Sequence, residues 1–89
     1  MDSKSCEKAT GAIADKYRLS ILQELAHRES MTPSDIQELT GLSQPCVSHH
    51  VRLLTESELV VAIKEGRNLH LRLNKDTMRQ LTAFLAQLS

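Results

Sequence analysis

Aromatic side chains are almost missing from this chain of 89 residues, which has no tryptophan, one tyrosine and one phenylalanine. The hydrophobic fraction is nevertheless an ordinary 40%. We therefore expect a core of leucine, isoleucine, valine, alanine and methionine, a set that favours packed helices. The length predicts a single domain. Because so short a chain buries only a modest share of its surface, an interface with a second copy would be a natural source of further stability.

The chain also lacks a net charge, with 11 basic and 11 acidic residues. This balance argues against a protein that coats nucleic acid without regard to sequence, but a sequence reader needs only a local basic face. Its two cysteines are too few for a disulfide framework and favour a reducing compartment. There is no apolar run of about 18 residues and no apolar leader at the N-terminus. We therefore expect a cytoplasmic protein without a membrane span.

Sequence motifs of enzymes are missing as well. The chain contains no G-x-S-x-G, phosphate-binding loop, H-E-x-x-H or converging pair of carboxylates. Asp15 and Tyr17 are better assigned to helix capping and packing than to catalysis. We therefore predict that the protein is not an enzyme and carries no cofactor.

The residues that are present form a series of helical patterns. A narrow apolar stripe predicts a first helix over about residues 5–13, and a broader apolar face predicts a second within residues 15–28. In the second helix, we expect Leu19, Leu22 and Ala26 to line one inward face. Ile21 and Leu25 widen that face, so we expect this helix to be covered on more than one side.

A short third helix has clear signals at both ends. Thr32 is a good N-cap and Asp35 completes a capping-box pattern, while Gly41 can adopt the left-handed conformation that ends a helix. Ile36 and Leu39 are expected to point inward. The next helix begins almost at once, with Ser43 as its N-cap. Two helices joined by so short a turn, over about residues 33–57, make a helix-turn-helix pattern.

After this pattern the apolar period changes to two, which predicts a β-hairpin over about residues 60–73. Gly66 and Arg67 provide the turn. We expect one apolar face and one polar, basic face. In the first strand, Val61 and Ile63 alternate with Val60, Ala62 and Lys64. In the second strand, three leucines alternate with polar residues that include His70 and Arg72.

A last helix is predicted over about residues 76–88 and carries its own apolar stripe. This stripe and that of the first helix are too apolar to remain in water, so we expect a dimer interface there. The candidate interface residues are Cys6, Ala9, Ile13, Met78, Leu81, Phe84, Leu85 and Leu88.

The predicted order of elements is that of a mainly α winged helix-turn-helix domain spanning residues 1–89. Three segments also resemble blocks of the arsenic-repressor type (ArsR/SmtB) of transcriptional regulators, namely AIADKYRLSILQEL, LSQPCVSHHVRLLTESELV and KEGRNLHLRLN. The resemblance covers roughly residues 12–75. It implies a homodimer formed through the first and last helices, a recognition helix in the major groove, and a wing near the DNA backbone. It also implies repression that an effector, often a metal ion, relieves.

The exposed face of the predicted recognition helix and the wing carry the candidate contacts to double-stranded DNA. On the helix these are Gln44, Ser48, His49 and Arg52, and on the wing Lys64, Arg67 and His70. The alternative is an ordinary solvated polar surface. Arg18 and Lys16 are weaker candidates for phosphate contacts.

A metal site is the competing interpretation of Cys46, His49 and His50, since their spacing could bring three ligands together on one helix. A fourth ligand is missing, and the three side chains are expected on different parts of the helix. The resemblance adds that metal-sensing members carry cysteines in the helix before the turn, or acidic and histidine ligands on the last helix. This chain has no cysteine in the first of these helices and no histidine in the last. We therefore predict no metal site.

The leading hypothesis is a dimeric, sequence-specific repressor that binds an inverted-repeat operator. One alternative is a redox-responsive repressor that acts through Cys46, whose place in the first turn of a helix favours a thiolate. Another is a winged-helix module that binds a protein and never contacts DNA.

Overall fold

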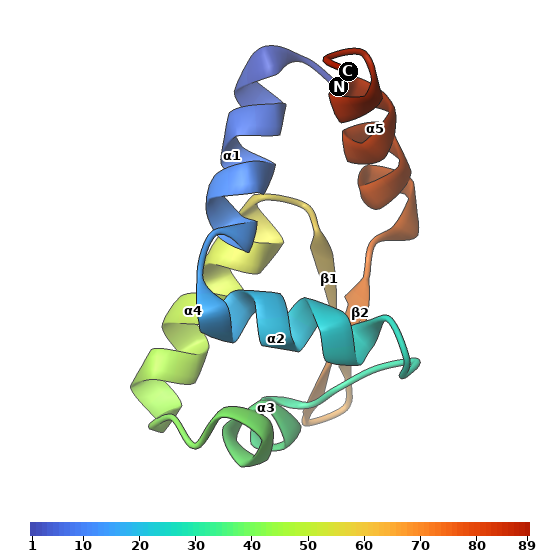
Figure 1. The fold of residues 1–89 in the computed structure, drawn as a ribbon. Coiled ribbons are helices and arrows are strands. Elements are labelled where there is room, and N and C mark those ends of the chain that lie inside the picture. The colour runs from blue at the N-terminus through green and yellow to red at the C-terminus, as the bar shows by residue number, and fades with distance from the viewer.

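The computed structural model describes residues 1–89 and has five helices and one β-hairpin (Figure 1). In chain order these are α1 (Ser3–Ile13), α2 (Lys16–Leu25), α3 (Pro33–Thr40), α4 (Gln44–Glu56), β1 (Val60–Glu65), β2 (Asn68–Leu73) and α5 (Lys75–Ala86). The predicted winged helix-turn-helix order is confirmed. In Figure 1, α1 and α5 extend to the same end of the molecule, where both termini lie, while α3 and the hairpin turn lie at the other end. None of the helices combines the length and hydropathy needed to cross a bilayer.

The core is aliphatic, as the composition predicts, and every helix and both strands contribute to it. Its largest fully buried side chains are Ile21, Met31, Ile36, Val47, Leu54, Leu59 and Leu71. Phe84 is only partly buried at its margin. The helix-turn-helix is therefore held by α2, by the hairpin and by the segment around Met31, which together leave one side of α4 free.

Two predicted inward faces are partly wrong. In α2 the buried residues are Ile21, Leu22 and Leu25, whereas Leu19 is 43% exposed and Ala26 lies beyond the end of the helix. The helix contacts α1, α3, α4 and β2, so it is covered on more than one side as expected, but Leu19 lies outside the covered surface. In α3, Ile36 is fully buried but Leu39 is 42% exposed, because this two-turn helix contacts the core through a single residue.

The helix ends agree with the predicted caps in position. Asp15 caps α2 by accepting hydrogen bonds from the amides of Tyr17 and Arg18 at 2.9 and 3.0 Å. Thr32 and Asp35 form the capping box of α3, and Gly41 ends that helix with φ of 73°. Ser43 occupies the N-cap position of α4 without making a side-chain hydrogen bond.

The segment around Met31 is an addition that the sequence pattern did not predict. Met31 and Leu71 exchange two backbone hydrogen bonds, of 3.0 and 2.8 Å, in an antiparallel bridge. The loop between α2 and α3 therefore runs beside β2 and ties the start of the helix-turn-helix to the hairpin. A single bridged residue leaves no periodic pattern that could be found in the sequence.

The hairpin has the predicted turn, but its faces differ from the prediction. The two-residue turn pairs Glu65 with Asn68, and this register places Lys64 opposite Leu69 and His70 opposite Ile63. Lys64 therefore lies on the face that carries the buried Leu71, and His70 lies on the opposite face. The expected single basic face does not form. Val60 is the buried valine, and Val61 is 41% exposed.

Candidate nucleic-acid interface

The exposed side of α4 carries the four helix residues that were predicted to contact DNA. Gln44, Ser48, His49 and Arg52 are all exposed, while Val47 on the opposite side is buried. A guanidinium nitrogen of Arg52, Nη2, lies 3.2 Å from Nδ1 of His49. Because arginine can only donate, His49 accepts, and the two side chains are held beside each other on the open surface. No other hydrogen bond of their side chains is formed within the protein.

The tip of the wing adds two exposed cations beside this helix. Lys64 and Arg67 are both exposed, and neither forms an ion pair. An open groove of about 320 Å³ lies between α4 and the hairpin, and Ser48 and Arg52 line it together with Ala62 and Leu69. Since Ala62 and Lys64 point to the same face of β1, Lys64 lies on the side of the wing that faces α4.

His70 differs from these two wing residues in its surroundings. It lies on the other face of the hairpin and is only partly exposed. It is near enough to Asp35 to contribute, after the hydrogen bonds from Thr32 and the charge of Arg28, to the lowered pKa of that carboxyl group. Its role in DNA contact remains a prediction.

The inner flank of α4 is fixed by a set of polar contacts that sequence reasoning missed. Arg18 on α2 donates from Nε to the carbonyl of Ala12 at 2.6 Å and from Nη1 to Nδ1 of His50 at 3.0 Å. A carboxylate oxygen of Asp15 lies 3.9 Å from the same His50 nitrogen. We call Asp15, Arg18 and His50 the anchoring cluster. It joins the end of α1, the start of α2 and the middle of α4.

The anchoring cluster also determines the protonation of His50. Nδ1 must be unprotonated to accept from Arg18. Burial lowers the pKa of His50, and the charges of Arg18 and His49 lower it further, whereas Asp15 opposes the shift. His50 is therefore a neutral acceptor in the folded protein near pH 7. Arg18, considered from the sequence as a weak phosphate candidate, is used to position α4.

The three residues of the competing metal interpretation differ in their contacts, although the rings of His49 and His50 lie 5.5 Å apart. Cys46 and His49 are exposed, and His50 faces Arg18. No group of three histidine, cysteine, aspartate or glutamate side chains is arranged to hold a metal ion. Cys6 is buried in α1, and Cys46 is free at the start of α4. A redox role of Cys46 remains a prediction.

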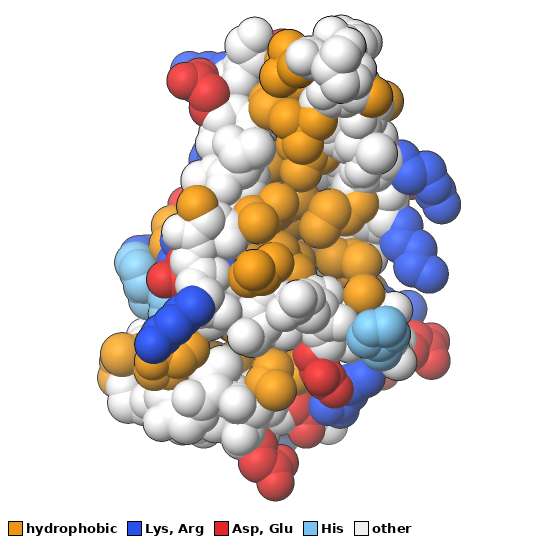
Figure 2. Space-filling model, in the orientation of Figure 1, with side chains coloured by type: hydrophobic (Ala, Val, Ile, Leu, Met, Phe, Trp, Pro, Cys, Tyr) orange, Lys and Arg blue, Asp and Glu red, His pale blue; other side chains and the backbone are white.

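Hydrophobic side chains gather in a column between α1 and α5 (Figure 2). Of the predicted interface residues, Cys6, Ala9 and Leu81 are already buried within the protomer. Ile13, Met78 and Phe84 are partly buried around them. Leu85 and Leu88 are 42% and 74% exposed. An apolar strip therefore remains open on this side, away from the exposed face of α4.

The family model described as a helix-turn-helix domain matches residues 13–62, from the end of α1 into β1. The chain is 34% identical over 74 residues to the arsenical resistance operon repressor of Staphylococcus aureus, a match that covers 83% of this chain and 70% of the relative. The chain belongs to the ArsR family. Another relative, the transcriptional repressor SdpR of Bacillus subtilis, is 32% identical over 68 residues, with 76% and 74% of the two chains covered.

Solved structures agree with this ArsR fold over nearly the whole chain. The crystal structure of an ArsR family transcriptional regulator matches 99% of this chain and 90% of its own, with a TM-score of 0.87 and 22% identity. The solution structure of a homodimeric winged helix-turn-helix DNA-binding domain from Mycobacterium bovis matches 96% of this chain and 79% of its own. Its TM-score is 0.77 and its identity 24%. At these identities the likeness concerns the fold.

Proposed function

We propose that this ArsR-family protein is a homodimeric transcriptional repressor that reads a specific operator with the exposed face of α4. The observation that carries the proposal is the open polar face of that helix. Its four polar side chains have no hydrogen-bond partners in the protein apart from one another, while the opposite flank is fixed by the anchoring cluster. Relatives named as repressors support the direction of regulation.

The chemistry of this face suits the edges of bases in a major groove. A glutamine such as Gln44 can bind adenine through two hydrogen bonds, and arginine can do so with guanine. Ser48 and His49 are less selective donors and acceptors. The contact between His49 and Arg52 at 3.2 Å restricts both side chains before DNA arrives, which reduces the entropy lost on binding.

The wing supplies contacts that position the protein without reading bases. Lys64 and Arg67 are unpaired cations at its tip, and such groups bind phosphate oxygens and release counterions. His70 lies on the other face of the hairpin, so we expect a smaller contribution from it.

A second copy of the chain completes the proposed repressor. The open apolar strip with Leu85 and Leu88, next to the buried residues shared by α1 and α5, supports an interface there. A two-fold dimer presents two α4 helices to the same side of a duplex, so the operator would be an inverted repeat. Its half-sites would lie one or two turns apart, at a spacing of about 10–10.5 base pairs per turn. A homodimeric structural relative supports this assembly.

The experiment is a mobility shift with fragments from the upstream region of the gene itself, read against a scrambled duplex of equal length. We expect a saturable complex with one fragment and a steep loss of affinity with salt, because each phosphate contact contributes a slope of about −0.9 in log K against log salt. No shift at low salt would contradict the proposal and favour the protein-interaction alternative. If peroxide weakens DNA binding by the parent but not by Cys46→Ser in the same assay, the result would support the redox alternative.

A further inference from the structure

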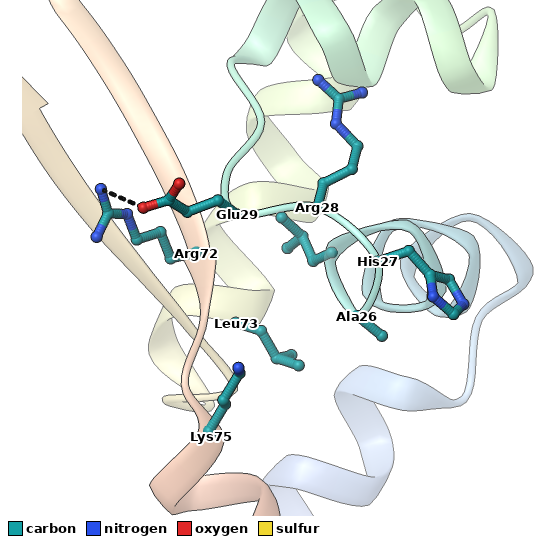
Figure 3. Close-up of a pocket in the computed structure, with 8 residues that line it drawn as sticks. Ala26, His27, Arg28, Glu29, Arg72, Leu73 and Lys75 are labelled. Carbon is teal, nitrogen blue, oxygen red and sulfur yellow. Dashed lines mark ion pairs between the residues drawn. The ribbon is translucent and has the colours of Figure 1, made fainter.

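A second surface feature lies away from α4, where α2 ends, β2 ends and α5 begins. A cavity of about 410 Å³ opens there. Leu25, Ala26 and Leu73 form its apolar wall, and Arg72 and Lys75 also line it, with the guanidinium of Arg72 turned toward Glu29 (Figure 3). The volume lies within the range of about 300–1,000 Å³ that is usual for small-molecule sites. None of these residues belongs to the proposed DNA-reading face.

The charge around the cavity is unbalanced. Arg28 and His27 also border it, but Figure 3 shows both turned outward, and Arg28 is paired with Asp35 at 3.3 Å. Lys75 forms no ion pair and extends toward Leu73. The single carboxylate of the wall, Glu29, lies 3.8 Å from Arg72 with its side chain 86% exposed. So exposed and distant a pair is weak, and it leaves the cavity positive.

Arg72 has a further unsatisfied group. Its Nε is buried and has no hydrogen-bond partner, the one side-chain nitrogen or oxygen in the protein of which this is true. A buried donor left unpaired costs free energy, but a donor without accessible surface is not within reach of a ligand. Arginine also offers its donors in a planar arrangement that matches a carboxylate or a phosphate group. The Arg72 side chain is 44% exposed as a whole, so an anion in the cavity would contact the accessible part of its guanidinium.

We propose that this cavity binds a small organic anion. A carboxylate or phosphate group of the ligand interacts with Arg72 and Lys75, and its apolar part lies against Leu25, Ala26 and Leu73. The positive charge and the apolar wall each correspond to one part of such a ligand. Inorganic ions would satisfy only the charged part and would bind more weakly.

The position of the site gives the ligand a regulatory role, and this step rests on the proposed function. Arg72 belongs to β2 of the wing, and Lys75 is the first residue of α5, next to the proposed dimer interface. A ligand held by both fixes the angle between the wing and that helix. Its occupancy would therefore change operator affinity without touching α4.

The site is tested first on the DNA-free dimer by amide chemical-shift titration with benzoate, phenyl phosphate and inorganic phosphate. We expect saturable shifts at residues 25–29 and 72–76, with the aromatic anions binding more tightly than inorganic phosphate. The benzoate and phenyl phosphate arms distinguish a carboxylate ligand from a phosphate ligand. Shifts that are scattered over all basic residues, or that fail to saturate, would overturn the proposal.

Two matched variants make the test specific. Lys75→Gln should weaken the tighter probe roughly tenfold to a hundredfold, because it removes a charge-assisted contact. Arg79→Gln removes an exposed cation from the same helix, one that does not border the cavity, and should leave the affinity unchanged. Equal affinities of both variants and the parent would contradict the site. Arg72→Lys, which keeps the charge but loses the planar donors, should also weaken binding.

The regulatory step is then read by operator binding with and without the tighter probe at constant ionic strength. We expect the operator Kd to change several-fold in the parent and not in Lys75→Gln. An unchanged Kd in the parent would overturn the regulatory role. Probe binding by a protein that binds no DNA would contradict the proposed function and leave the anion site intact.

Discussion

His49 and His50 are neighbours in the sequence but belong to two different regions of the molecule. His49 is exposed on the outer face of α4, where its hydrogen-bond partner is Arg52, although its ring lies 5.5 Å from that of His50. His50 lies on the inner flank, where its side chain is 12% exposed and contacts Arg18. The first region has hydrogen-bonding capacity to spare, whereas the second uses Nδ1 of His50 and two nitrogens of Arg18, Nε and Nη1, within the protein.

This difference indicates how a helix can be both firmly placed and available. Arg18 donates to the carbonyl of Ala12 near the end of α1 and to the side chain of His50 in the middle of α4, so the position of α4 follows that of the helix next to the proposed dimer interface. The outer face can then keep unpaired polar groups, because the stability of the helix does not depend on them. Each region can be altered alone, which allows the comparison to be tested.

The largest expected effect comes from removing the anchor. Arg18→Gln should lower the free energy of unfolding by about 2 kcal/mol, because the variant lacks the hydrogen bonds from a charged donor to Ala12 and His50. Thermal or urea unfolding at constant protomer concentration measures this. Lys16→Gln is the control, since that exposed side chain only lies over the ring of Tyr17 and should cost at most about 0.5–1 kcal/mol. Equal destabilisation of both variants would mean that the anchoring cluster has no special role.

An intermediate effect is expected at the wing, where stability should not change. Lys64→Gln with Arg67→Gln should reduce the salt dependence of operator binding, by about 0.9 in slope for each phosphate that the variant no longer binds. His70→Gln tests the opposite face of the same hairpin and should change the slope less. A larger change in slope with His70→Gln than with the double variant would reverse the assignment of the two faces.

The smallest effect concerns pH. The folded-state pKa of His50 is lowered from 6.5 by burial, so the unfolded chain takes up this proton at a higher pH than the folded protein. The stabilisation that neutral His50 contributes is therefore complete above the unfolded-state pKa of 6.5. It is lost as the pH falls through the lower pKa of the folded state. His50→Gln should reduce the decline of unfolding free energy as the pH falls below 6.5. His27→Gln, an exposed control, should not. An unchanged pH profile in His50→Gln would contradict the assignment.

Periodicity and end signals were enough to predict the order of elements and the faces of α4. The capping box at Thr32 and the glycine at Gly41 are local, and their effect appears where the sequence predicts it. The faces of the hairpin were predictable in principle, because a two-residue turn fixes which residues pair. A two-residue turn at Gly66 and Arg67 is enough to place Lys64 and His70 on opposite faces.

The features that could not be predicted depend on contacts between segments far apart in the chain. Arg18 and His50 are 32 positions apart, and nothing in either helix marks them as partners. The bridge between Met31 and Leu71 is similar in this respect. The exposure of Leu19 and Leu39 also depends on which neighbours cover each helix, which an apolar stripe does not reveal.

The central claim is that the outer face of α4 reads the operator. The most direct measurement is the ratio of affinities for operator and scrambled duplexes in the double variant His49→Ala with Arg52→Ala. Gln23→Ala, at an exposed position of α2, serves as the control. We predict that the ratio falls roughly tenfold or more in the double variant, with unchanged unfolding free energy and an unchanged ratio in the control. A double variant that discriminates as well as the parent would contradict the claim.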